Sequence, residues 1–134
     1  MGAEPYLITS TLLASLGQRL VRTLCALCKR PRPATAEEIR DFSLSGDAIP
    51  QFWDAVGCPE CAHLGYRGRS GVFEILRVTD EIRDLILQRR PASVIRSAAE
   101  QAGMVPMGRA GIALALSGAT TVDELRRVVF ADAG

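Results

Sequence analysis

The first regular pattern in the chain is a stripe of apolar residues in its opening quarter. Its members recur three or four positions apart, which is the spacing of one face of a helix: Ile8, Leu12, Leu13, Leu16, Leu20, Val21 and Leu24. The pattern predicts an amphipathic helix from Ile8 to Leu24 that leads directly into Cys25. The apolar face of this helix has to be covered, either by the rest of the chain or by a preceding domain of a longer protein.

Helical patterns also dominate the second half of the chain. Four helices are predicted there, over residues 80–90, 92–102, 106–117 and 121–130. Thr79 and Thr121 carry the hydroxyl groups that cap helix N-termini, and Thr121 with Glu124 forms the pattern of a capping box. Gly103 and Gly118 stand where helices end. These elements predict a compact helical domain.

The middle of the chain has a different character. Thr35 and Glu38 form another capping box, which predicts a short helix through about Phe42. The stretch 72–76 is rich in β-branched and aromatic residues and predicts a strand. We expect the Gly-rich stretch 65–71 to be the other arm of a small hairpin. The predicted fold class is therefore mainly α with a small β-hairpin, in which a tetracysteine subdomain precedes a compact helical C-terminal domain.

Candidate chemistry lies in the four cysteines of the chain, which form two Cys-x-x-Cys pairs. The pairs are Cys25 with Cys28 and Cys58 with Cys61. Two such turns supply four thiolates, which complete the tetrahedron that structural zinc prefers. A closed site of this kind leaves no position for a reactive water. We therefore predict structural Zn²⁺ at these four residues and no catalytic or cofactor-binding residue in the chain.

Other interpretations of the cysteines remain open. Two disulfides would suit a secreted chain, but no signal peptide is visible at the N-terminus. A thioredoxin-like redox site needs a single pair at the start of a helix. His63, the only histidine, lies two residues after Cys61 and would be a ligand only if it replaced a thiolate.

Composition limits the classes of function further. The formal net charge of the 134 residues is +1, so no broad attraction to nucleic acid is expected. The longest uncharged run, from Pro5 to Gln18, is too short and too polar to span a bilayer. No GxxxxGK[ST] motif occurs, so the chain has no phosphate-binding P-loop of its own. Paired cysteines without a secretion signal indicate a reducing, cytoplasmic setting.

The order of the motifs resembles the C-terminal part of the type II secretion and type IV pilus assembly ATPases, the general secretory pathway protein E family. The resemblance covers about Glu4 to Val129. It rests on Gln18-Arg-Leu-Val-Arg22, the two cysteine pairs, Gly65-Tyr-Arg-Gly-Arg69, Gly71, Glu74, Gly103-Met104 and Gly118-Ala-Thr-Thr121-x-Asp-Glu124. The chain departs from the family pattern at Ala110, where an acid is common.

This resemblance implies that the chain contains three parts with different roles. Residues 1–24 would belong to the end of a preceding ATPase domain, 25–78 to a zinc-binding subdomain, and 79–134 to a helical C-terminal domain. ATP and Mg²⁺ would be bound only in the upstream domain, which carries the Walker motifs. The partners would be that domain, neighbouring subunits of a hexamer and inner-membrane secretion or pilus platform proteins. The motor would be cytoplasmic and peripheral to the inner membrane.

Two other functions are weighed against this one. A free-standing zinc ribbon could bind nucleic acid or another partner through Arg67 and Arg69, although the low net charge and few aromatic residues argue against nucleic acid. A dithiol oxidoreductase would carry thiols of low pKa that are open to alkylation.

Overall fold

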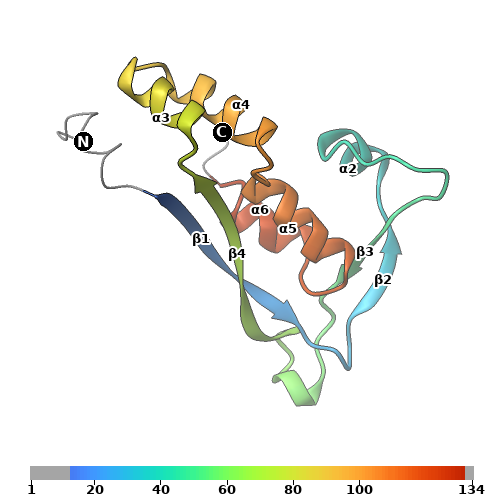
Figure 1. Ribbon diagram of the computed structural model, residues 1–134. Coiled ribbons are helices and arrows are strands. Elements are labelled where there is room, and N and C mark those ends of the chain that lie inside the picture. Colours follow the sequence, from blue (N-terminus) through green and yellow to red (C-terminus); the bar gives the residue numbers. More distant parts are fainter. Residues whose placement is uncertain (1–12, 132–134) are drawn as a thin grey trace. The chain divides into compact units, whose positions relative to one another are not determined.

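The computed structural model describes residues 13–131 of the chain. Within that range the chain forms four strands, five α-helices and one short 3₁₀ turn, which are arranged as in Figure 1. The strands form two separate two-stranded sheets, β1 with β4 and β2 with β3. The strands are β1 (Ala14–Leu24), β2 (Arg30–Pro33), β3 (Gln51–Asp54) and β4 (Tyr66–Arg77). The helices are α2 (Ala36–Asp41), α3 (Asp80–Leu87), α4 (Ala92–Gln101), α5 (Met107–Leu116) and α6 (Val122–Val128).

The helix predicted before Cys25 is wrong over the residues that the structure describes. Ala14–Leu24 is strand β1, and Ile8 and Leu12 lie outside the described residues. Pairing with β4, more than 40 residues later in the chain, decides the structure here. The helical spacing did not mark a buried face either, because Leu16 and Leu20 are exposed whereas Val21 and Leu24 are buried.

The predicted hairpin between residues 65–71 and 72–76 is also wrong. Apart from Gly65, both stretches belong to one continuous strand, β4, which pairs with β1. The fold is therefore less helical than the sequence suggested, and "mainly α" is only partly correct. The five helices and the proximity of the four cysteines are as expected.

The second sheet is a small antiparallel pair. Its register aligns Arg30 with Asp54 and Pro33 with Gln51. Phe52 of β3 is fully buried, which anchors the pair on the core. Figure 1 shows α2 at the far end of this pair. The capping box that begins α2 is confirmed, because the Thr35 hydroxyl accepts from the Glu38 N–H and the Glu38 carboxylate accepts from the Thr35 N–H.

One compact unit, called here the helical-pair unit, comprises residues 13–17 and 73–106 of the described chain. It contains α3 and α4, which pack on each other. Its core is Val78, Ile82, Ala98, Ala99 and Met104. Thr79 caps α3 as predicted, since its hydroxyl accepts from the Ile82 N–H at 3.3 Å.

The other unit, called here the cysteine unit, comprises residues 18–72 and 107–131. Its core is Val21, Ala34, Phe52, Val72, Ile112, Ala115, Val122 and Leu125. Helices α5 and α6 approach closely, because a Cβ on Gly111 would lie 2.9 Å from Leu125 Cδ2. The two units do not follow the boundaries 1–24, 25–78 and 79–134, so that division stays a prediction. No helix within residues 13–131 is long and apolar enough to cross a membrane.

Candidate metal centre

The four cysteines converge at one end of the cysteine unit. Cys25 and Cys28 lie in the turn that follows β1, whereas Cys58 precedes and Cys61 ends the 3₁₀ turn Pro59–Cys61. Their sulfur atoms all lie within 4.8 Å of one another. Cys25 and Cys61 are buried, and the other two are partly buried. Two turns that are 33 residues apart in sequence therefore face a common centre.

Three of the six sulfur–sulfur distances match those of a tetrahedral metal site. Four ligands at about 2.3 Å from a zinc ion would lie about 3.8 Å from one another. The Sγ–Sγ distances are 3.8 Å for Cys25–Cys58, 3.9 Å for Cys28–Cys61 and 3.7 Å for Cys58–Cys61. None of the four is in a disulfide. The cysteines are thus placed close enough to bind a metal ion.

Backbone N–H groups point at two of the sulfurs. Gly57 donates to Cys28 Sγ at 3.3 Å, and both Cys58 and Gly65 donate to Cys61 Sγ at 3.2 Å. Donors of this kind stabilise thiolates and orient them toward a cation. Burial opposes the charged form of Cys61, but the two N–H groups, together with the Cys58 and Cys28 thiols, outweigh it and lower the pKa of Cys61 to about 6. Burial raises the pKa of Cys58 to about 11.

Two glycines allow the chain to fold around these sulfurs. Gly57 has a φ of 106°, and a Cβ there would lie 2.8 Å from the carbonyl oxygen of His63. Gly65 has a φ of 83°, and its Cβ would lie 2.7 Å from Ala55 Cβ. Both positions therefore require glycine. His63 is exposed and does not belong to the group of potential ligands.

The loop between α5 and α6 accepts hydrogen bonds from residues on either side of the first cysteine pair. The Leu24 N–H donates to the carbonyl oxygen of Ala119 at 2.9 Å, and the Lys29 ammonium donates to that of Gly118 at 2.9 Å. Lys29 Nζ also lies 4.7 Å from the centre of the Trp53 ring. The first cysteine pair is also joined to the segment that follows the second pair, since the Cys25 N–H donates to the Gly65 carbonyl oxygen at 3.0 Å.

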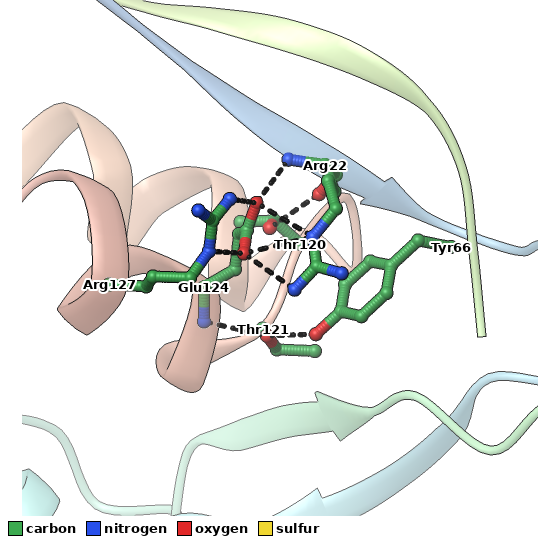
Figure 2. Close-up of polar contacts among 6 residues, drawn as sticks. All are labelled: Arg22, Tyr66, Thr120, Thr121, Glu124 and Arg127. Carbon is green, nitrogen blue, oxygen red and sulfur yellow. Dashed lines mark hydrogen bonds and ion pairs between the residues drawn. The ribbon is translucent and has the colours of Figure 1, made fainter. Parts of the chain in front are cut away.

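A buried carboxylate lies beside this loop, as Figure 2 shows. Glu124 of α6 has a fully buried side chain. It accepts from the Arg22 N–H at 2.7 Å and from the guanidinium groups of Arg22 and Arg127 at 2.8–3.2 Å. Burial opposes the charge on Glu124, but the two arginines outweigh it and hold its pKa at about 2.

The sequence had assigned Glu124 a local role that the structure corrects in part. Thr121 does cap α6, since its hydroxyl accepts from the Glu124 N–H at 3.0 Å. The Glu124 carboxylate, however, bonds to Arg22 on β1 and to Arg127. The sequence marked Glu124 twice, in a capping-box pattern and in the family motif that ends at Glu124. The capping-box pattern points to the wrong partner, and the motif names none.

Comparison with known proteins identifies the family. The family model described as "Type II/IV secretion system protein" matches residues 1–127. The chain belongs to this family. The cysteine pairs and the Glu124 cluster lie inside the matched range.

Named relatives agree with the family assignment. The chain is 39% identical over 132 residues, 98% of its length, to the "Type II secretion system protein E" of Aeromonas hydrophila. It is 49% identical over 86 residues, 64% of its length, to the "Type II secretion system ATPase E" of Vibrio cholerae. It is 34% identical over 128 residues, 93% of its length, to the "Type IV pilus assembly ATPase PilB" of Myxococcus xanthus. The matches cover 26%, 17% and 23% of those relatives, so this secretion-family chain spans about a quarter of their length or less.

Proposed function

We propose that this chain is the non-catalytic, zinc-binding C-terminal portion of a hexameric secretion or pilus-assembly ATPase. In this role Cys25, Cys28, Cys58 and Cys61 hold one structural Zn²⁺. ATP and Mg²⁺ are bound in an ATPase domain upstream of this portion. The observation that carries the proposal is the convergence of four cysteine sulfurs, all within 4.8 Å of one another, within a chain of this family.

The chemistry of the donor set supports zinc over other ions. Four thiolates are soft ligands, and a tetrahedral set of them is typical of structural zinc. All four positions of the tetrahedron are filled by protein, so the metal would stabilise the fold and would not activate water. The residues around it hold the sulfurs in place through backbone donors and through the loop between α5 and α6.

We also propose a mechanical role for this arrangement. The zinc site gives the motor a rigid support or docking face while the ATPase domain changes shape, and this helps to drive assembly of pseudopilins or pilins and protein secretion. We propose as partners the upstream domain, the neighbouring subunits and the inner-membrane platform of the machine. The motor then works in the cytoplasm, peripheral to the inner membrane. Residues 1–24, 25–78 and 79–134 are the proposed boundaries of the three parts.

Two assays on the purified chain test the non-catalytic assignment. We expect close to one zinc per chain by elemental analysis and no measurable ATP hydrolysis. Robust hydrolysis by the chain alone would overturn the assignment, and zinc far below one per chain would remove the proposed site.

A second experiment uses the longer protein to separate support from catalysis. Cys58→Ser in that protein should abolish secretion or pilus assembly and leave ATP binding intact, because the substitution removes a ligand without touching the nucleotide site. Loss of ATP binding in this variant would show that the zinc site supports the ATPase fold itself.

A further inference from the structure

We propose that Glu124 is a positioning residue for the metal site, which fixes the two strand ends from which the cysteine pairs extend. This inference rests on the proposed function, because it concerns the same four cysteines. It adds a residue of the last helix, far from the cysteines in sequence, to the apparatus that holds them.

The first contact that carries the inference is with β1. The Glu124 carboxylate accepts from the Arg22 backbone N–H at 2.7 Å, 102 residues away in sequence. A bond to a backbone N–H fixes the strand itself. Arg22 lies three residues before Cys25, and the Thr120 hydroxyl donates to the Arg22 carbonyl oxygen at 2.8 Å. Both backbone groups of Arg22 are therefore held by the start of α6 and the loop before it (Figure 2).

The second contact is with β4, which begins just after the other cysteine pair. The Tyr66 and Thr121 hydroxyls lie 2.8 Å apart, and Thr121 caps the helix that carries Glu124. The Arg22 guanidinium lies 4.2 Å from the centre of the Tyr66 ring, which joins the two contacts. Tyr66 directly follows Gly65, whose N–H donates to Cys61 Sγ. One cluster, with the buried Glu124 carboxylate in it, thus reaches the strand ends beside both cysteine pairs. It holds β1 directly and β4 through Thr121 and Arg22.

The burial of Glu124 fixes the position of the end of β1. The contacts of Glu124, Thr120 and Thr121 with Arg22 and Tyr66 are called the clamp below. A fully buried carboxylate must keep its hydrogen-bond partners, because a buried charge without them is strongly destabilising. Arg22 and Arg127 are 45% and 58% exposed, so the arginines remain partly hydrated while the acid does not. Any movement of the end of β1 away from α6 would leave the carboxylate short of donors. The strand end, and Cys25 with it, is therefore held in one position.

The experiment compares zinc release from the reduced, zinc-loaded chain with that from three variants. Glu124→Gln should release Zn²⁺ to a chromophoric chelator about tenfold faster, which corresponds to about 1.4 kcal/mol. The matched control is Asp123→Asn, which removes an exposed acid from the same turn and should release zinc at the wild-type rate. Arg127→Gln removes a donor that does not belong to the strand, while Arg22 keeps its bonds to the carboxylate, so it should accelerate release less than Glu124→Gln does. Wild-type release from a folded Glu124→Gln variant would overturn the inference.

If circular dichroism shows that Glu124→Gln does not fold, Tyr66→Phe provides a second test. It removes only the hydroxyl link to Thr121 and should accelerate release two- to threefold. An unchanged rate in Tyr66→Phe would then count against the inference.

Amide hydrogen exchange gives a readout that a merely structural role would not move. Because coupling between two sites is reciprocal, adding Zn²⁺ should slow exchange in α6 of the wild type, and Glu124→Gln should lose this response. An equal response in both proteins would refute the coupling.

Exchange in the reduced, zinc-free chain separates this inference from the proposed function. Glu124→Gln should speed exchange of the Arg22 and Leu24 amides there, since the clamp exists without metal. A wild-type chain that binds no zinc would overturn the proposed function, whereas unchanged exchange at Arg22 and Leu24 would overturn the positioning role alone.

Discussion

The helical-pair unit and the cysteine unit are stabilised by different kinds of contact. The first has an apolar core around Ile82, and its ion pairs, Arg83–Asp80 and Arg96–Glu74, lie at the surface. The second contains every buried polar or charged side chain of the described residues: Glu38, Thr120, Thr121 and Glu124. It also contains all four cysteines. The cysteine unit should therefore depend on metal and on pH, whereas the helical-pair unit should depend on apolar packing.

Removing the metal should produce the largest difference in stability between the two units. Apparent binding energies of structural zinc sites run to about 10–16 kcal/mol, which exceeds the stability of most small domains. A chelator, or Cys58→Ser, should therefore abolish amide protection in the turns that carry the cysteines and in β2–β3. The Arg22 and Leu24 amides at the end of β1 should keep part of their protection, and α3 and α4 should keep theirs. Hydrogen exchange read by mass spectrometry checks this. Equal loss of protection in both units would mean that they unfold together.

A core deletion in the other unit should give the reverse pattern. Ile82 is 1% exposed, and truncating such a residue costs about 2–5 kcal/mol. Ile82→Ala should lower protection of α3 and α4 by that amount and leave the zinc content of the chain unchanged. A loss of zinc in this variant would contradict the claim that the two units are stabilised independently.

Acid should weaken the cysteine unit through Glu38, apart from its effect on the thiolates. The bonds from Arg32 lower the pKa of Glu38 to about 2, against 4.5 for the ordinary group. The unfolded chain therefore takes up this proton first, so the stabilisation is complete above pH 4.5 and is lost as the pH falls toward 2. After screening by water at the partly exposed Arg32, we expect about 1–3 kcal/mol.

Denaturant unfolding at pH 7 and below pH 4 measures this contribution. The free energy of unfolding of the wild type is compared with that of two variants. Glu38→Gln should be less stable than the wild type at pH 7 and should lose less on acidification. Glu37→Gln, at the exposed neighbouring position on α2, should behave like the wild type. A pH response in Glu38→Gln as large as that of the wild type would exclude Glu38 as its source.

The smallest effect is expected from a surface ion pair of the helical-pair unit. Arg96 is 51% exposed and lies 3.0 Å from Glu74. Exposed pairs contribute less than about 1 kcal/mol. Arg96→Ala should therefore change the denaturation midpoint only slightly, and a loss above about 2 kcal/mol would show that this unit also depends on polar contacts.

Sequence reasoning succeeded where the signal is local. The spacing of Cys25 with Cys28 and of Cys58 with Cys61 marked two local pairs, because a Cys-x-x-Cys turn places two sulfurs together whatever surrounds it. That the two pairs meet was predicted from the four ligands that one structural zinc needs. The caps at Thr35, Thr79 and Thr121 were found for the same reason, since an N-cap bonds within its own first turn.

The failures were all contacts between distant segments. Leu16, Leu20 and Leu24 fit a helix by spacing, but pairing with β4 makes Ala14–Leu24 a strand. The Glu124 carboxylate fits a capping box, but its main partner, Arg22, lies 102 residues away. Neither the register of a strand nor the reach of a buried carboxylate is visible in a short window of sequence.

The central claim is that four sulfurs share one zinc ion, and X-ray absorption at the zinc edge tests it most directly. The account predicts one zinc per chain with a first shell of four sulfur atoms at about 2.3 Å. A shell that contains nitrogen or oxygen in place of any sulfur, or a chain purified under reducing conditions that holds no zinc, would contradict it.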